Sequence, residues 1–166
     1  MQANDVNLTT FLERQDHHFI IPIYQRNYDW GISQCEQLLE DIFLLGKTND
    51  NDSHFLGSIV FVHAGAYVTD PPRKLVIIDG QQRLTTITLL WIVLYRIAKE
   101  LGNEKLENEI HKIYLVNEFL DGDEKLKLRS TSNNDDALRY LIKGGDPQKY
   151  EKESQLINNF NHFKNL

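Results

Sequence analysis

The sequence of 166 residues contains one cysteine, Cys35. A single cysteine excludes an internal disulfide framework and a zinc site made of several cysteines, and it is typical of a protein in a reducing compartment. We therefore expect a cytoplasmic protein. Long apolar runs are also lacking, because the longest, at 87–95, is interrupted by Thr88 and is far shorter than the ~20 residues that cross a bilayer. We predict a core helix there and no membrane partner.

Basic residues are the minority among the charged ones. The chain has 18 Lys and Arg against 24 Asp and Glu, which gives a formal net charge of -6. A protein that holds duplex DNA through its phosphates normally carries a basic patch, whereas basic residues gather here only at 73–74 and 125–129. We expect no strong non-specific DNA binding by this chain. A pocket for one small phosphate ligand, by contrast, needs only a few cations.

The sequence does contain a strand, a tight turn and a helix in direct succession at 74–101. Residues 75–78 are apolar and mostly β-branched, Asp79-Gly80 makes the turn, and from Leu84 apolar residues recur every three or four positions. The first turn of such a helix directs unpaired N–H groups and the positive end of the helix dipole beyond the strand. Anions bind at such a position.

The side chains at this junction have two interpretations. Asp79 and Gln82 have the spacing of a capping box, which is a purely structural role. That role does not account for Arg83, because a cation in the first helical turn opposes the helix dipole unless an anion lies between them. The segment also supplies a dense set of hydrogen-bond donors for a phosphate: Gln81, Gln82, Arg83, Thr85 and Thr86.

An aromatic segment follows a short extended run near the N-terminus. Residues 19–23 are extended, and Pro22 favours the edge or the end of a strand. They lead into 24–30, where three aromatic residues stand close to Arg26. In one interpretation the aromatic residues are half-buried and Arg26 pairs with Asp29. In the other, this loop stacks on a base and brings Arg26 to a phosphate.

Other elements before residue 102 follow from the same patterns. Gly57, inside an apolar run, marks a bulge or a close approach of the backbone to another group. The expected elements are a helix at 7–15 with a capping box from Thr10, a helix from Ser33 that ends at Gly46 with Cys35 on its apolar face, and a central strand at 54–63.

After Gly102 the composition becomes more polar. The patterns predict a helix at 104–119, an exposed strand at 125–129, a helix at 135–143 capped by Asn134, and a helix at 151–166. The last helix has no C-cap signal, and we expect the chain to be a fragment of a longer protein. We predict two units, a core at 1–102 that carries the motifs and a mainly helical, truncated subdomain at 103–166.

Three segments, taken in order, resemble one family. They are IPIYQRNYDW at 21–30, HFLGSIVF at 54–61 and IDGQQRLTT at 78–86, and they resemble the signature of the GmrS-like N-terminal domain of GmrSD-type modification-dependent restriction enzymes. The resemblance implies an α/β fold like that of ParB and sulfiredoxin, with a small mixed sheet flanked by helices and a mostly helical C-terminal extension. In that superfamily the DGQQR position corresponds to a motif that binds and hydrolyses nucleotide phosphates.

The resemblance leads to our first hypothesis, a domain that binds a nucleoside triphosphate and hydrolyses it in a DNA restriction or phage-defence system. In this hypothesis the backbone from Gly80 to Arg83 and the hydroxyls of Thr85 and Thr86 hold phosphate oxygens. Arg83 and Arg26 neutralise the charge that develops on the transferred phosphoryl group. The family also implies DNA as a partner of the full-length protein and an HNH-type nuclease domain or subunit.

The remaining predicted roles concern water, metal and base. Asp79 would hold Mg²⁺ or orient a water molecule, and Gln81 or Gln82 would position that water. Tyr24, Tyr28 or Trp30 would stack on the base, and Gln25 and Gly57 complete the predicted nucleotide-binding site.

Two hypotheses of other classes use the same residues. In the first, the chain is a DNA-cleaving module whose phosphate site holds the DNA backbone, which would require divalent metal but no nucleotide. In the second, it is a non-catalytic regulatory or assembly domain, in which DGQQR is only a capped junction between strand and helix.

Overall fold

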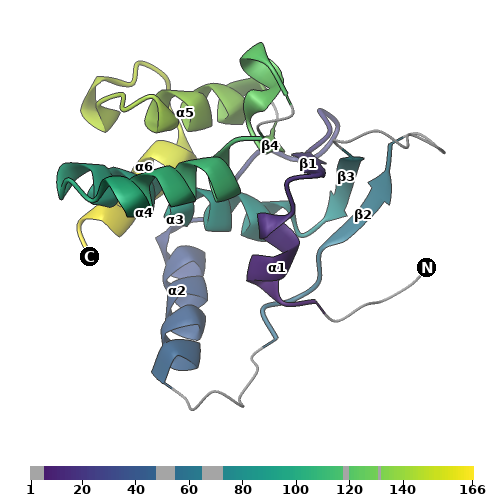
Figure 1. Ribbon diagram of the computed structural model, residues 1–166, viewed down its shortest axis with the longest axis horizontal. Coiled ribbons are helices and arrows are strands. Elements are labelled where there is room, and N and C mark those ends of the chain that lie inside the picture. The colour runs from purple at the N-terminus through teal and green to yellow at the C-terminus, as the bar shows by residue number, and fades with distance from the viewer. Residues whose placement is uncertain (1–5, 48–54, 65–72, 118–119, 131) are drawn as a thin grey trace.

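The computed structural model describes residues 6–47, 55–64, 73–117, 120–130 and 132–166. Among them it forms a small mixed sheet flanked by helices (Figure 1), which confirms the predicted α/β class. The strands are β1 (His17–Ile20), β2 (Val60–His63), β3 (Arg73–Asp79) and β4 (Leu128–Arg129), and the α-helices are α1 (Leu8–Glu13), α2 (Ile32–Lys47), α3 (Gln81–Glu100), α4 (Glu104–Ile110), α5 (Ser132–Ile142) and α6 (Gln155–Lys164).

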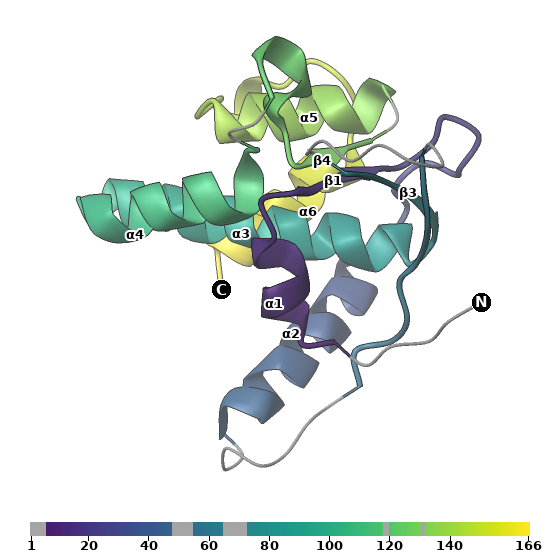
Figure 2. The ribbon, with the colours of Figure 1, turned by 45° about the vertical axis from the view of Figure 1, so that its right-hand side comes forward.

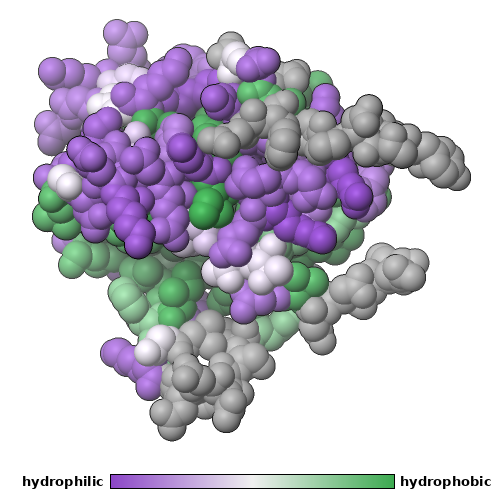
Figure 3. Space-filling model, in the orientation of Figure 1, coloured by the Kyte–Doolittle hydropathy of each residue, from purple (hydrophilic) through white to green (hydrophobic). Residues whose placement is uncertain are grey.

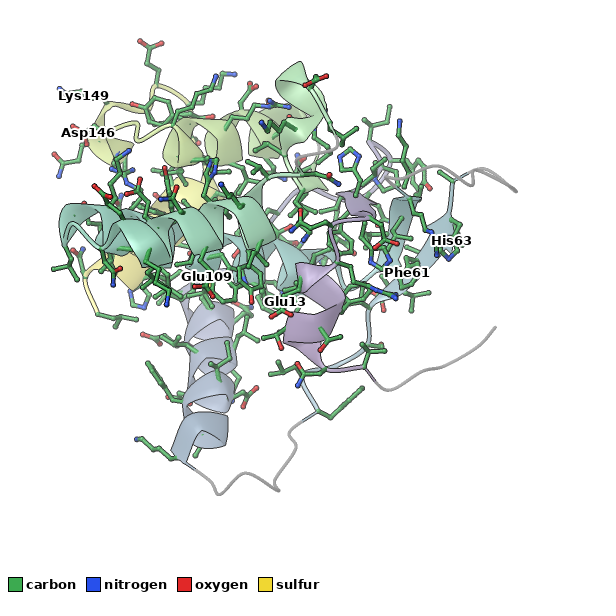
Figure 4. All side chains as sticks on the ribbon, in the orientation of Figure 1. Glu13, Phe61, His63, Glu109, Asp146 and Lys149 are labelled. Atoms are coloured by element: carbon green, nitrogen blue, oxygen red, sulfur yellow. The ribbon has the colours of Figure 1, made fainter. Side chains whose placement is uncertain are left out.

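The strands are ordered β2-β3-β1-β4 across the sheet. β1 runs parallel to both β3 and β4, and β2 runs antiparallel to β3 with a register shift at Val60 and Phe61. The predicted central strand at 54–63 is therefore wrong in two respects. It is an edge strand, and within the described residues it begins only at Val60, because 55–59 lie outside the sheet. Figure 4 shows Phe61 and His63 side by side on β2, with ring centroids 5.7 Å apart.

The predicted core helix is confirmed as α3, which is surrounded by other elements. It packs against α4, α5 and α6 (Figures 1 and 2), and its buried residues lie on more than one face. Full burial of a Leu, Ile, Val or Phe side chain stabilises the fold by roughly 1.5–3 kcal/mol. The fully buried residues of the sheet and these helices include Phe19, Leu75, Ile77, Leu84, Leu89, Ile92, Leu138, Leu141, Leu156 and Phe160.

Helix α2 extends away from this body (Figures 1 and 2). Near its start Cys35 is buried, as predicted, whereas Phe43 and Leu44 towards its end are exposed. In the space-filling view apolar residues gather at the lower left over α2, while the upper part of the same face is mostly polar (Figure 3). The helix also continues past Gly46 to Lys47, one residue beyond its predicted end.

Several predicted caps are wrong by a few residues. The N-cap of α1 is Asn7, whose side chain accepts a hydrogen bond from the Thr9 amide, and not Thr10. Asn134 lies inside α5, which already begins at Ser132. In both cases an earlier polar residue starts the helix, so the capping pattern in the sequence marks the right region but not the right position.

The segment between α4 and α5 differs most from the prediction. α4 ends at Ile110 and passes into a π-helical turn at His111–Leu115, so the described part of 104–119 is not one α-helix. Of the predicted exposed strand at 125–129, only Leu128–Arg129 forms a strand, and the predicted exposure is wrong. Residues 126–128 are buried, because β4 pairs with β1 inside the fold.

Candidate functional site

The site is organised by the junction between β3 and α3. β3 ends at Asp79, and the N-cap of α3 is Gly80, in the left-handed conformation with φ +86°. A Cβ atom on residue 80 would lie 2.8 Å from the Ser58 carbonyl oxygen. Only glycine therefore meets both requirements of this turn, which are a positive φ and a close approach to the neighbouring backbone.

The predicted capping box at this junction is wrong. The Asp79 carboxylate accepts a hydrogen bond from the adjacent Gly80 amide at 2.8 Å, and no side chain caps α3 among the described residues. Gln82 turns away to bond a different segment. Among the described residues, the N–H groups of the first turn of α3 therefore have no capping side chain.

Three glutamines attach the loop at 24–30 to this junction. Gln25 Nε2 donates to the Ile78 carbonyl at 3.1 Å, and Gln81 Nε2 donates to Gln25 Oε1 at 3.3 Å. Gln82 accepts from the Asp29 amide at 3.0 Å and donates to the Asn27 carbonyl at 2.9 Å. The two sequence motifs thus form one unit. The side chain of Gln82 is engaged at both ends of its amide, so it holds the loop rather than a water molecule.

Three residues predicted to contact the nucleotide lie in the core instead. The Tyr28 hydroxyl and Thr86 Oγ1 are 2.8 Å apart, and Thr86 also donates to the Gln82 carbonyl at 2.9 Å. Tyr28, Thr85 and Thr86 are all buried. Burial also raises the pKa of Tyr28. The hydrogen bonds of Tyr28 and Thr86 therefore stabilise the junction from within, and none of the three residues lines the cleft described next.

A cleft of about 440 Å³ opens on the outer side of this junction. Three segments line it, namely the loop at 24–30, called the aromatic loop below, the stretch before β2, and the turn from β3 into α3. The lining residues are Gln25, Arg26, Trp30, Phe55, Gly57, Ser58 and the six residues from Ile78 to Arg83. Of the other predicted site residues, Tyr24 is exposed but is not among those that line the cleft.

Two arginines, Arg83 and Arg26, are among the residues that line the cleft. Arg83 donates to the Ser58 carbonyl at 3.1 Å, and a Cβ atom on Gly57 would lie 2.5 Å from its Cζ atom. The close approach predicted at Gly57 is thus confirmed, and its partner is Arg83. Arg26 pairs with Asp29 at 3.1 Å on the surface, as one of the two interpretations of this loop expected.

Among the described residues that line the cleft, Asp79 supplies the carboxylate. Among the described residues no three side chains of His, Cys, Asp or Glu come together to hold a metal ion. Asp79 alone fits a Mg²⁺ ion that arrives with its ligand, because Mg²⁺ is commonly bound by one or two carboxylates together with substrate phosphates. It does not fit a permanent metal centre held by the protein alone.

Sequence reasoning missed three residues that matter at this site. Phe55, which the strand prediction placed in the sheet, is 78% exposed and lines the cleft. Ser58 supplies the carbonyl that holds Arg83. Asn159, on α6, bonds both Tyr28 and the Trp30 carbonyl. The signal for Asn159 was available, since it is an amide at a buried position of an amphipathic helix.

Residues 8–166 match the family model described as GmrSD restriction endonuclease, N-terminal domain. A search of curated proteins finds no match. No helix within the described residues is long and apolar enough to span a membrane.

Proposed function

The chain belongs to the family of N-terminal domains of GmrSD restriction endonucleases, and on that premise we propose that its cleft binds and hydrolyses a nucleoside triphosphate. Family membership implies a role in restriction, and hence in phage defence. The nucleotide is the finer proposal. It rests mainly on one observation, which is the convergence of an uncapped helix N-terminus and two arginines on one cleft.

The helix N-terminus supports binding of the phosphates. α3 has 20 residues, its first residues line the cleft, and no side chain caps its N-terminus among the described residues. Such an end carries a partial positive charge and favours an anion by roughly 0.3–1 kcal/mol at an exposed site. In our proposal the backbone from Gly80 to Arg83 holds phosphate oxygens, whereas Thr85 and Thr86 do not take part.

The two arginines supply the remaining positive charge. Arg83 uses one N–H group on Ser58, which leaves further donors of its guanidinium fork for a phosphate. Arg26 is held by Asp29 in an exposed ion pair, an interaction worth only ~0–1 kcal/mol, so exchanging it for a phosphate costs little. Both can therefore stabilise charge that develops on the transferred phosphoryl group.

The rest of the cleft suits the other parts of a nucleotide. Asp79 would hold Mg²⁺, which when bound neutralises phosphate charge. Trp30 and Phe55 are the aromatic residues of the lining, and they replace Tyr28 as candidates for stacking on the base. The volume of about 440 Å³ falls within the common range of ligand pockets, about 300–1,000 Å³.

A phosphate-release assay tests this proposal. Each of the four common nucleoside triphosphates is incubated with the chain and Mg²⁺, and the active one is used for Arg83→Ala, Asp79→Asn and the control Arg14→Ala. Arg14 is exposed and does not line the cleft. We expect Arg83→Ala to lower kcat/KM by about 10²-fold or more, as loss of a charge-stabilising donor does, with Arg14→Ala near the wild-type value.

Other outcomes would favour the other hypotheses. Unchanged turnover in Arg83→Ala would contradict the proposed role of the cleft. Metal-dependent nicking of DNA without any nucleotide would favour the nuclease hypothesis. No turnover and no binding of any nucleotide would favour the regulatory or assembly hypothesis.

A further inference from the structure

Helix α6 is linked to the residues around the cleft by the buried side chain of Asn159. Asn159 is fully buried, and its Nδ2 donates to the Trp30 carbonyl at 2.7 Å and to the Tyr28 hydroxyl at 3.0 Å. Its Oδ1 accepts from Gln155 Nε2 at 3.1 Å, one turn earlier on the same helix. The amide is therefore satisfied at both ends, and its orientation is fixed because the Trp30 carbonyl can only accept.

The two bonds from Nδ2 connect to two segments of the cleft lining. Trp30 lines the cleft directly. The Tyr28 hydroxyl, in turn, lies 2.8 Å from Thr86 Oγ1, and Thr86 donates to the Gln82 carbonyl in the first turn of α3. One side chain from α6 thus connects to the aromatic loop and to the helix end that the proposed phosphate site uses.

General packing does not require an amide at this position. The neighbouring buried residues of α6, Ile157, Phe160 and Phe163, are apolar. Burying an amide costs free energy unless it is fully hydrogen-bonded, so an apolar residue would serve the core as well. What an apolar residue cannot do is hold a loop carbonyl that lies outside regular secondary structure, as Asn159 holds that of Trp30.

We propose that Asn159 is a positioning residue of the cleft. It fixes the position of Trp30 and, through Tyr28, of the start of α3 relative to each other. Its effect on nucleotide binding rests on the function proposed above. Its effect on the position of Trp30 does not, and this difference separates the two proposals experimentally.

The first arm of the test needs no ligand. The sequence has two tryptophans, and Trp91 stacks on Tyr114 with ring centroids 3.8 Å apart. In a Trp91→Phe background, Trp30 is the single indole, and acrylamide quenching of its fluorescence reports its accessibility. We expect Asn159→Ala to roughly double the quenching constant, because the loop loses its buried anchor and opens locally. The control Phe163→Leu, on the same helix, should leave quenching unchanged.

The second arm measures binding of the nucleoside triphosphate that the phosphate-release assay identifies, with Mg²⁺, by titration calorimetry. We expect Asn159→Ala to weaken binding on the order of tenfold, the equivalent of one buried hydrogen bond. Phe163→Leu should bind with the wild-type affinity when the two proteins are compared under conditions in which both are folded to the same extent. Tyr28→Phe removes the link to Thr86 but keeps the bond to the Trp30 carbonyl, so an intermediate loss is expected.

The outcomes separate the two proposals. Unchanged Trp30 quenching in a folded Asn159→Ala protein would overturn the positioning role, whether or not a nucleotide binds. If the wild type binds no nucleotide while quenching still rises in Asn159→Ala, the proposed function fails and the positioning role stands. If Asn159→Ala does not fold, Asn159→Ser decides, because its hydroxyl is too short to reach both partners and the same increase in quenching is expected.

Discussion

Gly57 and Arg83 share one small region at the edge of the cleft. The guanidinium of Arg83 occupies the space that a side chain on residue 57 would fill, and Gly57 itself has φ +100°. Arg83 is thus held by the bare backbone on one side and by the Ser58 carbonyl on the other. The glycine sets where this cation lies relative to the N-terminus of α3.

Replacing Gly57 by alanine should disturb both the backbone and Arg83. Gly102 provides a matched control, because its φ is +68° and an added Cβ atom would meet nothing within 4 Å. A left-handed alanine costs roughly 1–2 kcal/mol in either place. We expect Gly57→Ala to lower the free energy of unfolding in urea by about 1 kcal/mol more than Gly102→Ala, because Arg83 must also move. Equal losses in the two variants would contradict this account of the contact.

For individual residues, the sequence predicted which segments form the site better than it predicted which of their side chains face the cleft and which are buried. Arg83, Arg26, Gly57 and Gly80 were predicted at the site and lie at the cleft. Tyr28, Thr85 and Thr86 were also predicted and are buried. The loop around Tyr28 has no period from which its inward side could be read, and the donors that follow Arg83 on α3 turn into the core.

Among the elements, the π-helical turn at His111–Leu115 depends on side chains from elsewhere in the chain. Its Ile113 carbonyl accepts from Lys127 Nζ at 2.6 Å and from Gln15 Nε2 at 3.2 Å. A π-turn interrupts the regular α-helical ladder, so its carbonyls need other donors. Lys127 is almost fully buried, and burial lowers its pKa to about 8.

The lowered pKa of Lys127 predicts a dependence of stability on alkaline pH. In the unfolded chain the pKa of lysine is about 10.4, so between about pH 8 and pH 10 the unfolded state binds more protons than the folded state. The contribution of Lys127 to the free energy of unfolding therefore rises with pH across this window. It is lost as the pH falls through the pKa of Lys127 in the folded state, about 8. The slope is at most about 1.4 kcal/mol per pH unit.

Comparison with Lys127→Met isolates this contribution. Urea unfolding of both proteins at several pH values from 7 to 10 gives the difference in their free energies of unfolding. We expect the wild type to gain relative to Lys127→Met as the pH rises above about 8. A difference that stays constant over this range would show that Lys127 does not titrate inside the window.

Elements with strong local patterns were predicted best. β3, α3 and α6 follow from apolar runs and periodicity, and each forms close to where it was expected. The edge position of β2 and the burial of Lys127 were not predicted. Both depend on which strands become neighbours, and that choice is made by contacts between segments far apart in the sequence.

At the scale of the whole molecule, segments from both ends of the chain build one core. β4 pairs with β1, and α6 packs against α3 and α2 (Figure 1). One cluster of buried apolar residues contains Phe19 and Leu75 together with Leu138 and Phe160. The cleft depends on this arrangement as well, because Asn159 holds the aromatic loop from the C-terminal part.

We therefore expect the chain to unfold as one cooperative unit. Urea transitions followed by tryptophan fluorescence and by far-ultraviolet circular dichroism should coincide, as they do for a two-state domain. A chain cut after residue 102 should not show a cooperative transition, because it lacks β4 and α6. Two separate transitions in the full chain would instead favour the predicted division into a core at 1–102 and a subdomain at 103–166.

The central claim is that a nucleoside triphosphate binds where β3 meets α3. Thermal melting of the chain with and without each of the four nucleoside triphosphates and Mg²⁺ tests it most directly, with Arg83→Ala and Arg14→Ala measured alongside. A ligand at a hundred times its dissociation constant stabilises the fold by ~2.7 kcal/mol, a readily measured rise in Tm. The account predicts a rise with at least one nucleotide in the wild type and Arg14→Ala and none in Arg83→Ala. No rise with any nucleotide, or an equal rise in Arg83→Ala, would contradict it.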